Sequence, residues 1–207
     1  MTLSNYDELR ASIAGWLHRD DLTDVIPDFI KGAEQLINYG AVDTPALRVA
    51  EMETTATVSL ASGVGTLPSG FLSARRVRSM TSPARVLEAV TPEWASERFP
   101  SAGAGDPAFF TIIGSSIQVY PATSSNLSIT YYSAVPPLAS NSTNWLLTKA
   151  PMIYLYGSLI HSAPYLGDDG RAQTWGSLYR NAVSGLSASD IRGRFGRMGT
   201  RTRSPTP

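Results

Sequence analysis

The spacing of apolar residues changes twice along the chain, and this limits the possible folds more than any other feature. Apolar residues recur at helical spacing up to about residue 40, alternate with polar residues from about residue 46, and return to helical spacing after Pro151. One element cannot satisfy both periods, because side chains repeat every 3.6 residues on a helix and every two on a strand. The pattern therefore predicts an α+β fold in which a β-rich lobe is inserted into a helical bundle.

The N-terminal segment predicts two short amphipathic helices that form a helical hairpin. Ser4 is suited to cap the first helix, with Asp7 as its capping-box partner three residues later. His18 should lie at the C-terminus of this helix, where the helix dipole favours a cation. Pro27 suits the first turn of the second helix, and Gly40 suits its end.

The C-terminal third predicts two more helices, the first of which packs on this hairpin. The segment TNWLLTKAPMIYLYG, residues 143–157, is rich in aromatic and aliphatic side chains and should supply core. Pro164 removes a helical hydrogen bond, so it should kink or end the first of these helices. The second helix should begin near Asp168 and fade by about Ser189.

The middle of the chain predicts about five strands in a mostly antiparallel sheet. The segments FFTII and IQVY, separated by Gly114, Ser115 and Ser116, give the clearest hairpin signal. Residues 91–99 predict one short helix, with Thr91 as its cap and Pro92 at its first position. We therefore divide the chain into a helical bundle domain (1–45 and 144–190), a β-rich inserted lobe (46–143) and a flexible, Arg-rich extended tail (191–207).

Composition supports a folded protein, and the charged residues are unevenly distributed along the chain. The chain has 207 residues, of which 43% are hydrophobic, and it has no cysteine, which excludes disulfides and thiolate metal sites. No stretch has the roughly 20 apolar residues of a membrane span, so we expect no membrane partner. The net charge is zero, yet five arginines and no acid lie in residues 192–207, which leaves the rest of the chain at −5. An acidic body with a basic tail indicates that the tail meets something negative.

The sequence offers little for catalysis. Its two histidines, His18 and His161, are each expected to be structural. No nucleophile elbow, zinc-binding helix, phosphate loop or dinucleotide fingerprint is present. We therefore expect no enzyme, and no catalytic, cofactor-binding or metal-binding residues.

Two basic segments each allow two interpretations. Arg75, Arg76 and Arg78 lie next to a predicted strand, either as a solvated edge that prevents aggregation or as a partner contact. The arginines after residue 191 lie among Gly and Ser, which suits binding to an acidic protein groove or to nucleic acid. The alternative for this segment is a tail that only aids solubility.

Several blocks of the sequence follow one another in a characteristic order: YDELRASIAGWLHRDDLTDVIPDFIKGAEQLIN, LRVAEMETTATVSL, TLPSGFLSARRVR, DPAFFTIIGSSIQVYPA, LSITYYSAVPPL and TNWLLTKAPMIYLYGSLIHSAPYLGDDGRAQTWGSLY. In order and spacing these blocks resemble the head–tail connector (adaptor) proteins of tailed bacteriophages, over about residues 5–190. The most specific parts are Ile26-Pro27, Ala33-Glu34 and the block from Asn144 to Trp175. Tyr39-Gly40 departs from the family pattern, in which a basic residue is more common.

The resemblance implies a structural protein of the virion neck, present in the host cytoplasm during assembly. It implies a homo-oligomeric ring of about twelve copies below the portal, with a portal protein and a downstream tail or stopper protein as partners. DNA would pass through the channel without sequence readout. The portal-binding residues would be Arg192, Arg194, Phe195, Arg197, Arg201 and Arg203. The candidates for subunit packing are Trp145, Tyr154, Tyr156, Trp175 and Tyr179.

Other function classes stay open at this stage. One is a nucleic-acid-binding module that uses the basic tail. Another is a different neck or tail-completion protein. A small hydrolase would need His18 or His161 to be essential.

Overall fold

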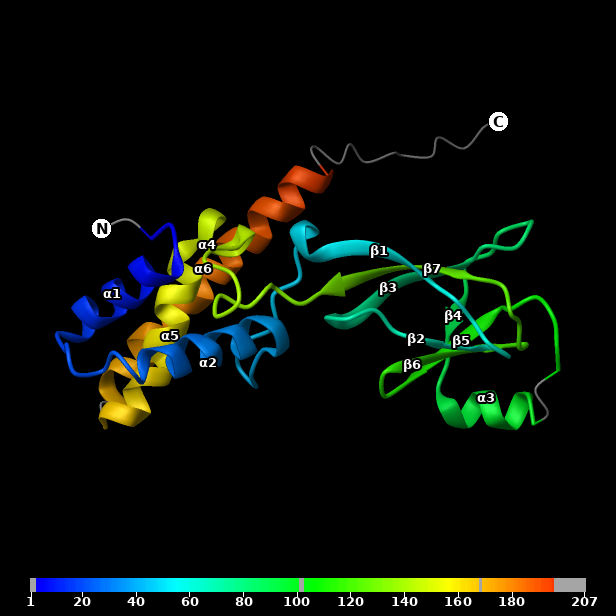
Figure 1. Ribbon diagram of the computed structural model, residues 1–207, viewed down its shortest axis with the longest axis horizontal. Helices are drawn as coiled ribbons and strands as arrows, with labels where there is room; N and C mark the ends of the chain where they lie inside the picture. The colour runs from blue at the N-terminus through cyan, green and yellow to red at the C-terminus, as the bar shows by residue number, and fades with distance from the viewer. Residues whose placement is uncertain (1–2, 101–102, 168, 196–207) are drawn as a thin grey trace, which may run out of the picture. The chain divides into compact units, whose positions relative to one another are not determined.

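The computed structural model describes residues 3–100, 103–167 and 169–195. In these residues the protein is mixed α+β, with six α-helices and two β-sheets (Figure 1). Contacts divide the chain into two compact units, Met1–Ala50 with Val135–Pro207, and Glu51–Ala134. We call them the helical unit and the β unit. The domain boundaries predicted from the sequence are not tested by this division and stay a prediction.

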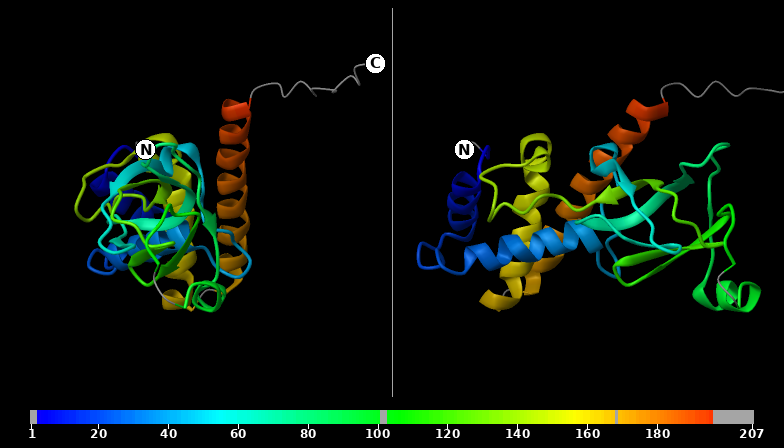
Figure 2. Two further views of the ribbon diagram at one scale, coloured as in Figure 1. Left: turned by 90° about the vertical axis from the view of Figure 1, so that its right-hand side faces the viewer. Right: turned by 45° about the vertical axis from the view of Figure 1, so that its right-hand side comes forward.

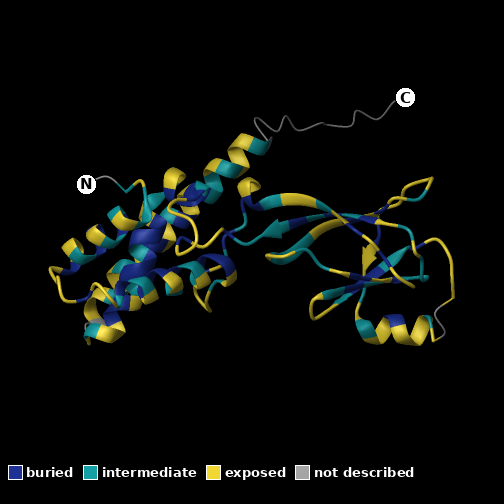
Figure 3. Cartoon of the chain, in the orientation of Figure 1, coloured by how far each residue is buried: buried dark blue, intermediate teal, exposed yellow. Residues whose placement is uncertain are grey.

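The helical unit is built around one central helix. Its helices are α1 (Tyr6–Leu17), α2 (Ile26–Tyr39), α4 (Trp145–Lys149), α5 (Pro151–Leu166) and α6 (Asp169–Phe195). Helix α5 contacts each of the other four, which confirms that it packs on the N-terminal helices. Its buried residues and those of α2 form much of the core (Figure 3). The two helices approach closely at Gly157, where an added Cβ would lie 2.9 Å from Ala33 Cβ.

The helix ends follow the sequence signals with one shift. The cap of α1 is Asn5 rather than Ser4: its Oδ1 accepts a hydrogen bond from Glu8 N at 2.9 Å. The backbone N–H of Ser4 donates to Glu8 Oε2 at 2.8 Å. The capping arrangement therefore lies one residue later than expected, because Asn5 and Glu8 have the same spacing as Ser4 and Asp7. The predicted end of α2 at Gly40, where φ is 74°, is confirmed.

The last two helices are longer than expected. Helix α5 continues past Pro164 to Leu166 and ends at Gly167, so the proline does not end it. Helix α6 has 27 residues and continues past Ser189 to Phe195 (Figure 2), so the predicted fading is wrong. A pair one turn apart, Arg194 Nε and Asp190 Oδ2 at 2.8 Å, holds this part of the helix.

In its described residues the β unit contains seven strands rather than about five. They are β1 (Glu53–Val58), β2 (Val64–Thr66), β3 (Phe71–Ser79), β4 (Glu88–Ala89), β5 (Phe109–Ile113), β6 (Ser116–Tyr120) and β7 (Leu127–Ser133). One sheet has the order β1-β7-β3 and the other β2-β6-β5-β4. All neighbouring strands are antiparallel except β4 and β5. The two short strands β2 and β4 carry too few residues to show an alternating pattern.

The two sheets of the β unit enclose one core. Alternate side chains of each sheet point into it, among them Val77, Ile129 and Tyr131 from one sheet and Phe110, Ile117 and Val119 from the other. The predicted hairpin between β5 and β6 is confirmed, with Gly114 at φ 60° in its turn. The short helix α3 (Pro92–Arg98) is also confirmed, because Thr91 Oγ1 accepts a hydrogen bond from Trp94 N.

Helix α3 covers the outer face of the four-stranded sheet. Trp94 packs on Phe109 with ring centroids 4.9 Å apart, and Phe99 stacks on Tyr120 at 5.7 Å. Phe109 and Tyr120 are cross-strand partners whose neighbours Phe110 and Val119 point into the core. The β unit therefore has three layers, in the order three-stranded sheet, four-stranded sheet and helix (Figure 1).

Candidate interaction surfaces

Three aromatic side chains from three helices meet at the surface of the helical unit. Trp16 of α1, Tyr156 of α5 and Trp175 of α6 have ring centroids 5.5 to 6.4 Å apart. Tyr156 and Trp175 are half-buried, and Trp16 is 38% exposed. Large aromatic rings that are partly exposed, and held in place by one another, are typical of the centre of a protein interface. We call these three residues the aromatic cluster.

The aromatic cluster contains only two of the five residues proposed for subunit packing. Trp16 was not among the candidates, although its ring lies partly in solvent beside Tyr156 and Trp175. Trp145, a third candidate, is half-buried at the start of α4.

Tyr154 and Tyr179, the other two candidates, lie inside the helical unit. Tyr154 is 0% exposed, and its hydroxyl accepts a hydrogen bond from Asn144 Nδ2 at 2.7 Å. Tyr179 is 1% exposed and packs against Gly157. Burial raises the pKa of both hydroxyls well above its usual value. These two rings therefore stabilise the protomer and offer no surface to a neighbour.

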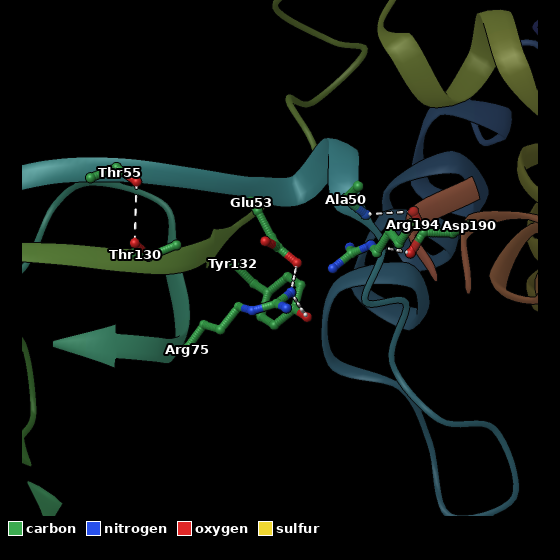
Figure 4. A network of polar contacts seen from close by, with 8 residues as sticks. All are labelled: Ala50, Glu53, Thr55, Arg75, Thr130, Tyr132, Asp190 and Arg194. Carbon is green, nitrogen blue, oxygen red and sulfur yellow. Dashed lines mark hydrogen bonds and ion pairs between the residues drawn. The ribbon is translucent and has the colours of Figure 1, made fainter. Parts of the chain in front are cut away.

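Of the proposed portal-binding residues, the structure describes the side chains of Arg192 and Arg194. Arg192 is exposed on α6, and Arg194 forms the ion pair with Asp190 (Figure 4). The other Asp190 carboxylate oxygen accepts a hydrogen bond from Ala50 N at 3.1 Å. Phe195 is the last residue of α6, and its side chain lies outside the described part of the chain, as do Arg197, Arg201 and Arg203.

The outer face of the three-stranded sheet is polar and basic. Arg75 pairs with Glu53 and lies 3.4 Å from the hydroxyl of Tyr132 (Figure 4). Thr55 and Thr130 share a hydrogen bond of 3.2 Å beside them. Arg76 and Arg78 pair in register with Thr130 and Ser128. Both arginines are exposed and alternate with the buried Val77, so they face solvent on the outer side of the sheet.

The end of α2 holds both segments that connect the helical unit to the β unit. On the outgoing segment, Leu47 N donates to Ile37 O, and Arg48 Nη1 donates to Asn38 O. On the returning segment, Val135 N donates to Asn38 Oδ1, and Leu138 N donates to Glu34 Oε1 at 2.7 Å. Burial raises the pKa of the Glu34 carboxyl, although the hydrogen bond from Leu138 opposes this shift.

The histidines occupy structural positions. His18 is the C-cap of α1 at φ 52°, as expected from the sequence. The ring of His161 packs against Gly32, where an added Cβ would lie 2.7 Å from the ring, and burial lowers the pKa of His161. This ring lines a groove of about 360 Å³ together with Leu36, Tyr39 and Ala41. One imidazole that shares this groove with Gln35, apolar side chains and glycines makes no nucleophile–base pair.

Other chemical possibilities find no support in the part of the chain that the structure describes. There, His, Asp and Glu side chains do not gather in threes as a metal site requires. None of the helices described is both long and apolar enough to cross a bilayer. What the surface displays instead is aromatic and charged groups suited to binding other macromolecules.

The comparisons with known proteins agree with a binding role. Residues 4–204 match the family model described as SU10 adaptor protein, whereas curated proteins gave no match. Because the match spans almost the whole chain, the protein belongs to the SU10 adaptor protein family. It is a bacteriophage adaptor, a structural component of the virion that interacts with other virion proteins.

Proposed function

We propose that this adaptor forms a ring in the neck of the virion, below the portal, and joins the capsid to the tail. Membership of the adaptor family carries this proposal. The ring would contain about twelve copies and would leave a channel for DNA. Its helical bundle, built on the N-terminal hairpin, would form the ring body. Its β lobe would project towards a tail or stopper protein, and its Arg-rich C-terminal segment towards the portal.

The aromatic cluster supports a contact between copies. Trp16, Tyr156 and Trp175 lie on three helices of one unit and are partly exposed together. Rings held in this way lose little side-chain entropy when a neighbour covers them. We propose that the cluster forms the centre of the subunit contact in the helical unit, with Trp145 as a further contact residue.

The Arg-rich C-terminal segment supports docking on the portal. Five arginines without an acid give residues 192–207 a strong positive charge. Arginine binds carboxylates through two parallel hydrogen bonds, so acidic clefts of a portal are suitable partners. The remaining chain, at a net charge of −5, would resist adsorption of the passing DNA.

Mixing the purified adaptor with its portal tests this function. Mass measurement should show a complex with many adaptor copies, and deletion of residues 192–207 should abolish it. Replacing Arg197, Arg201 and Arg203 by Gln removes charge but keeps the length of the segment. This variant therefore shows whether portal binding depends on the charge of the segment or only on its length. A full-length protein that never binds the portal, or a deletion that binds as well as the intact chain, would contradict the proposal.

A nucleic-acid-binding module is the second candidate, because the arginines of residues 192–207 other than Arg194, which pairs with Asp190, would bind phosphate. It predicts DNA binding that weakens steeply with salt and is lost on deletion of residues 192–207, with no effect on the portal. The adaptor proposal predicts only trivial DNA affinity at ~150 mM salt.

A further inference from the structure

The β unit separates its charges between two opposite faces. Arg76 and Arg78 project from the outer face of the three-stranded sheet, beside the paired Arg75 and Glu53. Among the described residues, neither Arg76 nor Arg78 forms an ion pair. Around them lie hydroxyl side chains of β1 and β7, so this face is polar and positive. We call it the arginine face.

The opposite side of the β unit is acidic. Residues 88–110 contain four acids, Glu88, Glu93, Glu97 and Asp106, against the single base Arg98. Glu93 and Glu97 lie one turn apart on α3 and are exposed. Trp94, between them in sequence, is 40% exposed while it packs on Phe109. This surface of α3 therefore presents two carboxylates beside a partly exposed aromatic side chain.

The two charged pairs have the same spacing. Arg76 and Arg78 are two residues apart on a strand, which corresponds to about 6.6 Å. Glu93 and Glu97 are four residues apart on a helix, which corresponds to a rise of about 6 Å. Each arginine of one pair can therefore meet one carboxylate of the other at the same time, and planar guanidinium groups bind carboxylates in defined geometry.

The pairs cannot meet within one chain. Two sheets and their shared core lie between the arginine face and α3, because Val77 and Phe110 from the two sheets both belong to that core. A contact between them must therefore join two copies, each using a different face. Such a contact is head-to-tail, and it closes into a ring when the rotation per copy allows.

We propose that α3 of one copy docks on the arginine face of the next copy, with Glu93 and Glu97 paired to Arg76 and Arg78. This inference deepens the proposed ring and rests on it. It gives the arginine cluster of β3 a partner of known chemistry: a second copy of this chain. It also places a salt-sensitive contact in the β unit, separate from the aromatic cluster of the helical unit.

Charge exchange tests the contact. R76E/R78E and E93K/E97K should each weaken self-association at least tenfold in sedimentation experiments at ~150 mM salt. The chain with all four changes restores opposite charges on the two faces and should return to within threefold of the wild type. D20K/D24K changes the net charge as much as E93K/E97K at an exposed site of the helical unit, and should have little effect. If the variant with all four substitutions assembles no better than the two double variants, the inference is wrong.

Cross-linking provides a test that does not depend on charge. The chain has no cysteine, so R76C/E93C carries only the two introduced thiols. With a short bismaleimide this variant should form a ladder of covalent multimers, whereas each single-cysteine variant should stop at a dimer at most. D20C/D24C is the matched control.

The failure of this inference and that of the proposed function are distinguishable. An assembled protein without a ladder contradicts only the inference. A protein that stays monomeric alone at high concentration also contradicts it, although a ring formed on the portal would still support the adaptor function.

Discussion

Asn38 Oδ1 accepts a hydrogen bond from the backbone N–H of Val135 at 3.0 Å, which joins α2 to a segment 97 residues further along the chain. Both groups are buried. The backbone carbonyl of Asn38 also accepts a hydrogen bond from Arg48 on the outgoing segment. One residue of α2 therefore binds both the segment that leads to residues 51–134 and the segment that returns from them.

Asn38→Ala should destabilise the protein by about 1–3 kcal/mol, because it leaves the Val135 N–H buried without an acceptor. Urea denaturation measures this change in the free energy of unfolding. Asn141→Ala is the control, since the Asn141 side chain makes its hydrogen bond to Pro137 O in an exposed position. An equal effect of the two substitutions would contradict a special role for Asn38.

Gly157→Ala should also destabilise, by about 1–3 kcal/mol, because the new methyl group would overlap Ala33 between α2 and α5. Gly185→Ala makes the same change in α6 where space is open, and should stabilise by up to about 1 kcal/mol. Opposite shifts of the thermal midpoint are the expected result. A neutral Gly157→Ala would mean that the two helices separate easily.

The Glu34 carboxyl should make stability depend on pH. Its pKa is raised in the folded protein, so the folded state holds the proton to higher pH than the unfolded state does. Stability should therefore fall as pH rises from the usual carboxyl pKa, near 4.5, through the raised folded value. Glu34→Gln cannot titrate, so its stability relative to the wild type should improve over this range. Denaturation at several pH values measures the difference, and parallel curves would contradict it.

Trp16→Ala should weaken self-association more than it weakens the fold. The ring is 38% exposed, and central aromatic residues of interfaces contribute about 2 kcal/mol or more to binding, which corresponds to roughly 30-fold in affinity. Analytical ultracentrifugation measures the loss. Tyr39→Ala removes a more exposed ring outside the aromatic cluster and should change association little.

Sequence reasoning predicted the elements with strong local signals. The hairpin around Gly114, the cap at Thr91 and the end of α2 at Gly40 each depend on a few adjacent residues, so periodicity and turn chemistry were sufficient. The strands β2 and β4 were missed because they are too short to alternate. The last turns of α6 were missed although Asp190 and Arg194 have the i,i+4 spacing of a helical ion pair. Only the hydrogen bond from Ala50 N to Asp190 is a tertiary signal.

The interaction surfaces were less accessible to sequence reasoning. Apolar periodicity assigns Tyr154, Tyr156 and Tyr179 to helix faces, but it does not tell which rings the neighbouring helices cover. Two of these are buried, whereas Tyr156 reaches the surface beside Trp16. The sequence also does not show that the β unit carries opposite charges on its two faces. Arg76 and Glu93 lie on opposite faces only because the two sheets pack on each other.

The hydrogen bonds that hold both connecting segments at the end of α2 also bear on how such a chain can be altered. Leu47 and Val135 bond to the adjacent residues Ile37 and Asn38, so the two places where residues 51–134 join the helices lie close together. An inserted segment whose two ends lie close together can be removed, shortened or replaced by a short linker. The helices on either side of it then keep their own packing. The same helical framework can thus accept a different insert through two neighbouring junctions.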